Sequence, residues 1–233
     1  MLTLCATRNK ASGHLADRRP AAGASELRQL RHHTKNALQR ILAQVLEAPG
    51  LLESARGQSL ARDIERRIKL SAAISDALFG LTRAPGPFAE RLHTLCWSVV
   101  DLYADPAQII RLDVTLEATC PPGGESLLLR IAHELVGNAV KHGMHMRLIG
   151  RITVRLVDDL NGWAVLSVAN DGWRLDDKVS MGDGLDLVDE LAAAQGGTMR
   201  LRAEPITTVE VRLPLSRRPS PGDTRGFIPR DAG

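Results

Sequence analysis

The sequence predicts an α+β fold in two parts, a helical hairpin followed by a layered sandwich of helices and strands. In residues 26–81, apolar residues recur at spacings of three and four, which is the period of helices with one narrow apolar stripe. After a run rich in Pro and Gly at residues 83–87, helical and strand-like stretches are segregated rather than strictly alternating. The first pattern predicts the hairpin, and the second predicts the sandwich.

The composition excludes several classes of protein. The 233 residues are 44% hydrophobic and 24% charged, which is typical of a globular protein. Aromatic residues make up only 3% of the chain, too few for the stacking platforms of single-stranded nucleic-acid binders, and the net charge is only +3. No apolar run approaches the roughly 18 residues that span a bilayer. The three widely spaced cysteines lack metal-ligand spacing and fit reduced thiols in a cytoplasm. We therefore expect a cytoplasmic protein that neither binds nucleic acid nor inserts into a membrane.

The hairpin is predicted at residues 25–82. Ser25 is a good N-cap residue, and a Pro-Gly pair at residues 49–50 separates the two helices. Two long antiparallel helices with narrow stripes cannot enclose a core between them. We therefore expect two copies to pair as a four-helix bundle, which makes the protein a homodimer. Residues 1–24 are expected to be a flexible segment and residues 216–233 a disordered tail.

The sandwich is predicted at residues 87–215. Its strands are indicated by alternating apolar and polar residues, and its helices by apolar residues at helical spacing. Gly143 is expected to end the second helix as a C-cap. The helices are expected at residues 88–103, 125–142 and 185–195, and the strands at residues 109–116, 152–157, 164–169, 198–202 and 207–213.

The helix expected at residues 125–142 has an unusual polar face. At about 100° per residue, one side of it carries four polar residues, Arg130, Glu134, Asn138 and Lys141. A carboxylate can accept a proton, an amide oxygen can bind a hard cation such as Mg²⁺, and a lysine can contact phosphate. For the spacing alone, a solvated helix face is the alternative interpretation.

Residues 133–143 resemble the N-box of the histidine-kinase, gyrase and Hsp90-type ATPases, in which an acidic residue is followed by Asn four residues later and then by Lys and His-Gly. The resemblance implies a Bergerat-type α/β sandwich that binds ATP and Mg²⁺. It implies that Asn138 binds Mg²⁺ and that Glu134 is catalytic, either positioning the cation's water shell or acting as a base. Lys141 and His142 are implied as contacts of the nucleotide.

A second segment is similar to the Asp-x-Gly-x-Gly box that holds the adenine in this family. It is Asn-Asp-Gly-Trp-Arg at residues 170–174, with Asn in place of the first Asp and Arg174 in place of the second Gly. The resemblance assigns Asn170 and Gly172 to the adenine site, where an Asn oxygen accepts a hydrogen bond without a charge. Taken alone, Asn-Asp-Gly is also an ordinary turn.

A third segment, Gly-Asp-Gly-Leu-Asp-Leu-Val at residues 182–188, is similar to the family's Gly-x-Gly-Leu-x-Leu-Val. Glycines let the backbone approach phosphates, and the N-terminus of the following helix attracts them. The resemblance assigns Gly182, Gly184 and Leu185 to the cofactor site. Residues 174–181 are expected to form a short lid over the nucleotide.

A histidine pair lies in the segment 31–39, which is similar to the phosphoacceptor box of the second dimerisation-and-phosphoacceptor class of histidine kinases and its HWE relatives. The alignment places His32 on the phosphorylated histidine. It places Asn36 on the position that orients water for phosphatase activity in many kinases, and His33 on the position that is usually Arg. Helix geometry points His32 directly away from the apolar stripe and His33 to its flank, where it is expected to act as a neighbouring base or to pack.

Together the four motifs imply a two-component histidine kinase that uses ATP and Mg²⁺ to phosphorylate His32 and passes the phosphoryl group to an aspartate of a response-regulator receiver domain. The alternative is a histidine phosphotransferase that relays phosphate without using ATP, which Asn170, Arg174 and the short lid favour. An ATP-binding regulator of the anti-sigma type is a third interpretation, opposed by the phosphoacceptor-like helix. No sensor domain is recognisable, so a separate sensor protein is an expected partner.

Overall fold

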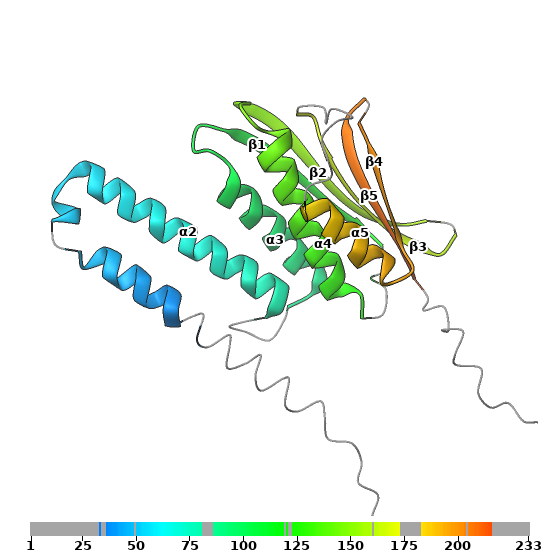
Figure 1. Cartoon of the computed structure of the whole chain (residues 1–233), viewed down its shortest axis with the longest axis horizontal. Helices are drawn as coiled ribbons and strands as arrows, with labels where there is room; N and C mark the ends of the chain where they lie inside the picture. Colours follow the sequence, from blue (N-terminus) through cyan, green and yellow to red (C-terminus); the bar gives the residue numbers. More distant parts are fainter. Residues whose placement is uncertain are drawn as a thin grey trace, which may run out of the picture.

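The computed structural model describes residues 33, 36–48, 50–80, 86–118, 120, 123–159, 161–172, 183–203 and 205–215. These residues form a helical arm beside a layered domain of helices on a sheet (Figure 1). None of their helices is both long enough and apolar enough to cross a membrane. Several expectations fall outside the described residues, among them the ends 1–24 and 216–233, the phosphoacceptor His32, the lid 174–181 and Gly182.

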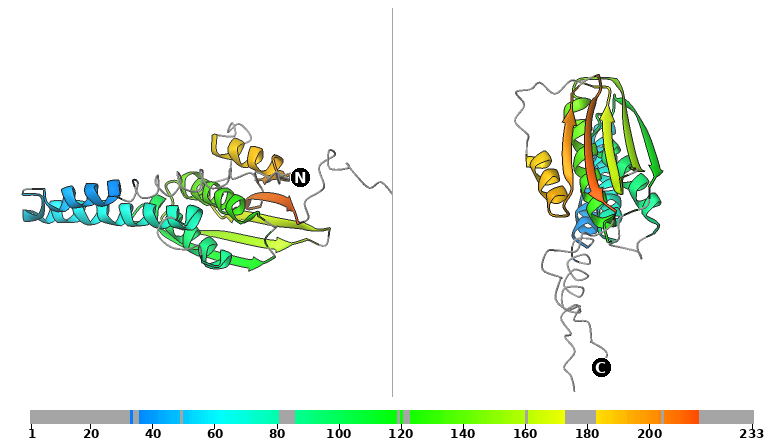
Figure 2. Two further views of the ribbon diagram at one scale, coloured as in Figure 1. Left: turned by 90° about the horizontal axis from the view of Figure 1, so that it is seen from below. Right: turned by 90° about the vertical axis from the view of Figure 1, so that its right-hand side faces the viewer.

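The arm consists of two helices. The helix of residues 36–46 runs antiparallel alongside α2 (Ala55–Phe79), and the short 3₁₀-helix η1 (Leu51–Glu53) lies in the connection (Figure 1, Figure 2). Ser54 begins α2 as an N-cap, because its hydroxyl accepts a hydrogen bond from a backbone amide of the first turn at 3.0 Å. Gly80 ends α2 in the left-handed conformation, with φ at 61°. The pairing of the arm with a second copy stays a prediction.

The layered domain packs its helices on one face of a five-stranded sheet (Figure 2). Its elements are the helices α3 (Phe88–Tyr103), α4 (Glu125–Asn138) and α5 (Asp183–Ala193), and the strands β1 (Ile109–Glu117), β2 (Ile149–Asp158), β3 (Trp163–Asn170), β4 (Thr198–Arg202) and β5 (Thr207–Pro214). The strand order is β1-β2-β3-β5-β4, in which β1 and β2 are parallel and the other neighbours are antiparallel. This is a mixed α+β arrangement, as the sequence predicts.

Buried residues alternate with more exposed ones along the central strands, so one face of the sheet meets the core and the other is its outer face. In β2 and β3 every second residue is buried, as expected for a sheet covered on one side only. The outer face of β1 and β2 carries arginines, and the side chains of Arg111, Arg151 and Arg155 are 67%, 55% and 53% exposed. The hydrophobic core therefore lies between the sheet and the helices.

The C-terminal end of α2 belongs to this same core. Ile74 and Ala77 are 6% and 5% exposed, and they cluster with buried residues of α3 and α4. Helical spacing predicts an apolar stripe on α2 that runs along Leu60, Ile64, Ile68, Ala72, Ser75 and Phe79. This stripe remains partly open, since Leu60 and Phe79 are 51% and 48% exposed. Ile74 and Ala77 lie off that stripe. Their burial comes from α3 and α4 of the layered domain, and the periodicity of α2 alone does not reveal it.

The helix with the polar face ends differently from the prediction. It is α-helical to Asn138 and continues as a π-helical turn, η2 (Ala139–Gly143), in which the Met144 amide donates to the carbonyl five residues earlier at 3.0 Å. Gly143 is not among the residues with positive φ, so it is not the expected left-handed C-cap. Packing requires a glycine there instead, because a Cβ on Gly143 would lie 2.3 Å from Oδ1 of Asn170.

Ile74→Ala is expected to destabilise the layered domain together with the arm, because it removes apolar contacts from the core that they share. Substitutions of this kind cost about 2–5 kcal/mol. Guanidinium unfolding should be followed by circular dichroism, which reports the helices, and by tryptophan fluorescence, which includes Trp163 in β3. Both midpoints should fall together.

The matched control is Leu52→Ala at the tip of the arm, where the side chain is 42% exposed. This change should cost less than about 1 kcal/mol. A fluorescence midpoint that Ile74→Ala leaves in place would contradict the shared core.

Candidate functional site

Two of the predicted site motifs meet where the N-terminus of α5 crosses the polar face of α4. Asn138 and Glu134 are half-buried on that face. A Cβ added to Gly184 would lie 3.1 Å from Nδ2 of Asn138 and 3.4 Å from Oε2 of Glu134. The fold therefore brings a carboxylate, an amide and a glycine backbone together at one place. Because a side chain at residue 184 would crowd both polar groups, glycine keeps this place open.

His133 is a member of this cluster that the sequence did not reveal. Its Nδ1 lies 3.0 Å from Oε1 of Glu134, and the two side chains are 24% and 30% exposed. Consecutive residues of a helix normally point about 100° apart, so adjacency in the sequence gives no reason to expect the contact. The pairing leaves Oε2 of Glu134 directed toward Gly184, while Oε1 is engaged by the imidazole.

Lys141 lies beyond the α-helical segment that carries Glu134 and Asn138. It lies in the π-helical turn, and its Nζ is 4.0 Å from the centroid of the Tyr103 ring at the end of α3. The same ring contacts the backbone of α4, since a Cβ on Gly137 would lie 3.6 Å from Cε2 of Tyr103. Lys141 and Gly137 therefore both meet the Tyr103 ring.

Asn170 and Gly172, at and just after the end of β3, lie directly behind the π-helical turn. Asn170 is the last residue of β3 and is 6% exposed, and its Oδ1 accepts a hydrogen bond from the Gly172 amide at 3.1 Å. A Cβ on Gly172 would lie 1.8 Å from the carbonyl oxygen of Gly143. The two motifs are thus in contact through the backbone of Gly143 and Gly172 and through the Asn170 side chain, and no larger residue fits at either glycine.

Asp171 fastens the same segment to the loop that comes after the π-helical turn. Its Oδ1 accepts from the Arg151 amide at 2.7 Å, and its carbonyl oxygen accepts from Nη1 of Arg147 at 2.6 Å. On the other side of the loop, Nε2 of Gln108 donates to the carbonyl oxygens of Met144 and Arg147 at 2.6 and 2.8 Å. Sequence patterns did not indicate these supports, because they join residues far apart in the chain.

The remaining predicted residues lie at the edge of the cluster or away from it. Leu185 packs partly buried against the core, and His142 is exposed. His33 is exposed and Asn36 half-buried on the first helix of the arm, which borders α2 and not α4 (Figure 1). Among the described residues, no three His, Cys, Asp or Glu side chains gather as a metal-binding group.

Comparison with known protein families identifies the domain that contains this cluster. Residues 123–217 match the model of the family described as "Histidine kinase-, DNA gyrase B-, and HSP90-like ATPase". The match covers less than half of the chain, so it characterises this domain, and it includes Glu134, Asn138, Asn170 and Gly184. No curated protein matches the chain.

Solved structures share the fold, among them the following two. The histidine kinase domain of the Erythrobacter litoralis EL346 blue-light activated histidine kinase is 18% identical, with a TM-score of 0.52 over 77% of this chain and 96% of that one. The longer structure of the EL346 kinase is 16% identical, with a TM-score of 0.53 over 83% of this chain and 61% of that one. At these identities the likeness establishes the fold. Both alignments extend beyond the ATPase-type domain into the rest of the chain.

Gly172→Ala is expected to destabilise the protein by about 2–3 kcal/mol or more, because the new Cβ meets a backbone carbonyl that cannot move aside as a flexible side chain would. Thermal unfolding of both proteins measures the effect. Gly86→Ala is the matched control, since the nearest atom to its Cβ is Oε2 of Glu90 at 3.6 Å, an ordinary contact. Equal melting temperatures for the two variants would contradict the close approach of the two motifs.

Proposed function

We propose that this protein is a two-component histidine kinase of the second dimerisation-and-phosphoacceptor class or its HWE relatives. In this proposal it uses ATP and Mg²⁺ to phosphorylate His32 and passes the phosphoryl group to an aspartate of a response-regulator receiver domain. The observation that carries the proposal is the convergence of Glu134, Asn138 and Gly184, which come from two separate motifs, inside a domain that matches an ATPase family.

The residues at the convergence suit ATP and Mg²⁺ chemically. The amide oxygen of Asn138 is a hard oxygen ligand of the kind that Mg²⁺ takes. Glu134 keeps Oε2 toward the cradle at Gly184, where the missing side chain lets a phosphate approach the backbone. We assign Asn138 to the cation and Glu134 to positioning its water or removing a proton, with Gly182, Gly184 and Leu185 bordering the phosphates.

Bound Mg²⁺–ATP would supply the phosphoryl group and neutralise its charge, so the protein contributes mainly position. Lys141 is assigned to a phosphate and His142 to the nucleotide. The contact of Nζ with the Tyr103 ring at 4.0 Å is compatible with that role. A cation–π contact at an exposed site is worth only about 0.5–1 kcal/mol, which a phosphate can readily replace.

Asn170 is assigned to the adenine, with Gly172 beside it. Its Oδ1 already accepts one hydrogen bond from the Gly172 amide, but an amide oxygen has two lone pairs and can accept another from the adenine amino group. Because asparagine carries no charge, this contact is weaker than the one an aspartate makes. We therefore expect the affinity for the nucleotide to depend more on Asn138 than on Asn170.

The part of the proposal that concerns the phosphorylated histidine involves the first helix of the arm. The motif alignment assigns His32 to phosphorylation, Asn36 to phosphatase activity on the regulator and His33 to the role of a neighbouring base. The arm also leaves apolar side chains in solvent, since Ile41, Leu46 and Leu60 are 49%, 41% and 51% exposed. These side chains support pairing of two copies into a four-helix bundle. We propose a cytoplasmic homodimer that receives its signal from a separate sensor protein.

A histidine phosphotransferase that relays phosphate without ATP is the second candidate. One observation favours it: the Oδ1 of Asn170 already accepts a hydrogen bond from the Gly172 amide of its own loop, which occupies one of its lone pairs. The polar pair on α4 and the glycine cradle favour the kinase, because a relay has no use for them.

Asn138→Ala is expected to keep the melting temperature of the ligand-free protein and to lose the stabilisation that ATP and Mg²⁺ give the wild type. At a ligand concentration 100 times the dissociation constant, that stabilisation is about 2.7 kcal/mol. Thermal unfolding with and without ATP and Mg²⁺ measures it. If the wild type itself is not stabilised, the phosphotransferase replaces the kinase as the proposed function.

His32→Gln is expected to abolish labelling by γ-labelled ATP and by a pre-phosphorylated regulator, because it removes the accepting nitrogen. His33→Gln should slow labelling by roughly 10²-fold or more without removing it, as loss of a general base does. The label should be acid-labile, as expected for a phosphohistidine. Labelling that survives in the first variant and vanishes in the second would show that the register is wrong by one residue.

A further inference from the structure

Arg91 of α3 joins the arm to the helix that carries the polar pair. Its side chain is only 11% exposed. Nε donates to the carbonyl oxygen of Ala77, in the last turn of α2, at 3.0 Å. Nη1 donates to Oε2 of Glu125, the first residue of α4, at 3.2 Å. One guanidinium therefore contacts two helices besides its own.

Both contacts lie at helix ends, where the helix dipole favours a positive charge at the C-terminus and a negative charge at the N-terminus. The last four carbonyls of a helix have no partner within it, and α2 has no basic residue of its own in its last turn. Arg91 supplies the missing donor and positive charge there. Glu125 places a carboxylate at the N-terminus of α4, where the helix dipole favours it. A guanidinium holds its donors on separate nitrogens in a rigid fork, so Arg91 makes the two bonds through Nε and Nη1, whereas a lysine has a single nitrogen on a flexible stem.

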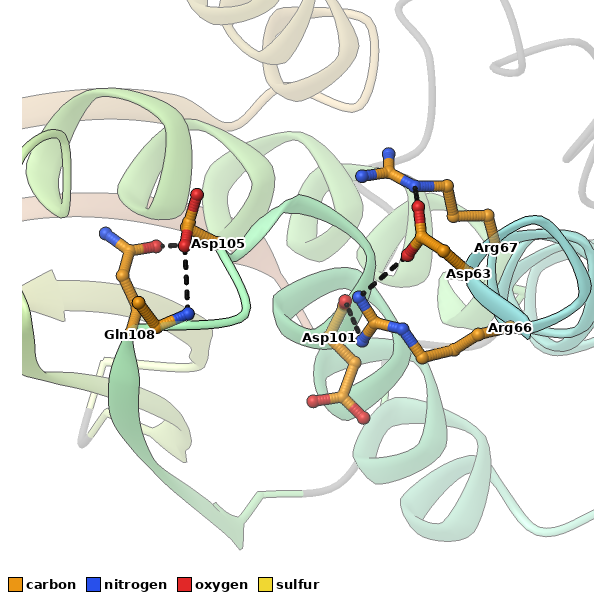
Figure 3. A network of polar contacts seen from close by, with 7 residues as sticks. Asp63, Arg66, Arg67, Asp101, Asp105 and Gln108 are labelled. Carbon is orange, nitrogen blue, oxygen red and sulfur yellow. Dashed lines mark hydrogen bonds and ion pairs between the residues drawn. The ribbon is translucent and has the colours of Figure 1, made fainter. Parts of the chain in front are cut away.

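A second arginine holds α2 further along its length. Nη1 of Arg66 donates to the carbonyl oxygen of Asp101, in the last turn of α3, at 3.1 Å, while Asp63 pairs with Arg66 and Arg67 (Figure 3). Arg66 lies eleven residues before Ala77, or about 16 Å along a helix. With Ile74 buried between these points, α2 is bonded to α3 at two places along its length. A helix held at two points cannot pivot freely on the domain.

We propose that Arg91 is a positioning residue for phosphoryl transfer. It fixes the direction of the arm, which carries the phosphoacceptor motif, relative to α4, which carries Glu134 and Asn138. Glu125 and Glu134 belong to the same helix and lie about 14 Å apart along it, so an angle set at Glu125 is passed rigidly to the site. The inference rests on the proposed kinase function. A histidine presented from one direction reacts faster than one that must search for the phosphate.

The test compares Arg91→Gln, Arg91→Lys and Glu125→Gln with the wild type. Arg67→Gln is the matched control, because the ion pair of Arg67 with Asp63, at 3.0 Å, lies within α2. Spin labels on cysteines at Ser59 of α2 and Thr198 of β4, both exposed, report the angle of the arm as a distance distribution. Labelled protein is diluted into excess unlabelled protein so that only distances within one chain are seen.

The native cysteines permit this labelling after Cys5→Ser. Burial raises the pKa of Cys96 to about 12, and burial together with the Glu125 carboxylate raises the pKa of Cys120 to about 11. A thiol reacts as its thiolate, so both should stay unlabelled at neutral pH. A parallel sample without the two introduced cysteines measures any background.

Arg91→Gln should broaden the distance distribution and lower the rate of labelling by γ-labelled ATP at least tenfold, while changing the dissociation constant for ATP less than twofold. Arg91→Lys should restore part of both readouts, and Glu125→Gln should broaden the distribution less than Arg91→Gln. Arg67→Gln should match the wild type. A merely stabilising arginine would lower the melting temperature without separating rate from affinity.

An unchanged distance distribution in Arg91→Gln overturns the inference, and so does an unchanged or raised rate of phosphorylation. If Arg91→Gln does not fold, the same criteria apply to Arg91→Lys and Glu125→Gln. Wild-type protein that is not labelled by ATP at all would count against the proposed kinase. The distance measurement still decides whether Arg91 fixes the arm, so the two failures are distinguishable.

Discussion

The arrangement of the site depends on one close approach between two pieces of backbone. The carbonyl of Gly143, at the end of the π-helical turn, occupies the place where a side chain of residue 172 would have to lie. This contact presses the end of the N-box helix against the end of β3, where Asn170 is buried. Asp171 holds the approach from the other side through Arg147 and Arg151. Two motifs about thirty residues apart, by the spacing of their glycines, are therefore held at a fixed distance from each other.

The other side of the same helix supplies the rigidity. Leu128, Ile131 and Leu135 of α4 are at most 2% exposed, and their burial fixes the direction of the helix within the core. Glu134 and Asn138 gain a defined position from this burial without being buried themselves. A scaffold anchored on one side and half open on the other suits a site that must admit a charged ligand, because the polar groups need no costly desolvation before the ligand arrives.

Periodicity predicted the elements well and their mutual contacts poorly. The helix at residues 88–103 and the strand at residues 198–202 begin and end where the sequence indicated, because their patterns are bounded by Pro and Gly residues. The π-helical turn was missed, since nothing in a local pattern separates i to i+5 from i to i+4 bonding. Lys141 lies in that turn, and its Nζ is 4.0 Å from the centroid of the Tyr103 ring. The burial of Ile74 was not predicted either, because contacts with helices far away in the sequence do not change the apolar periodicity of α2.

The residues at the convergence are not explained by local stability, and this bears on the choice between kinase and relay. Glycine near the start of α5 and asparagine at the end of α4 are both weaker helix formers than alanine, by up to about 1 kcal/mol each. The partly exposed pair of His133 and Glu134 contributes little to folding. A phosphate relay needs only the arm and a folded domain beside it, and alanines at these positions would serve that purpose better. A kinase needs an oxygen ligand, a carboxylate and an open backbone at one place. Gly184, Asn138 and Glu134 provide that combination at a cost in helix stability, and this favours the use of ATP.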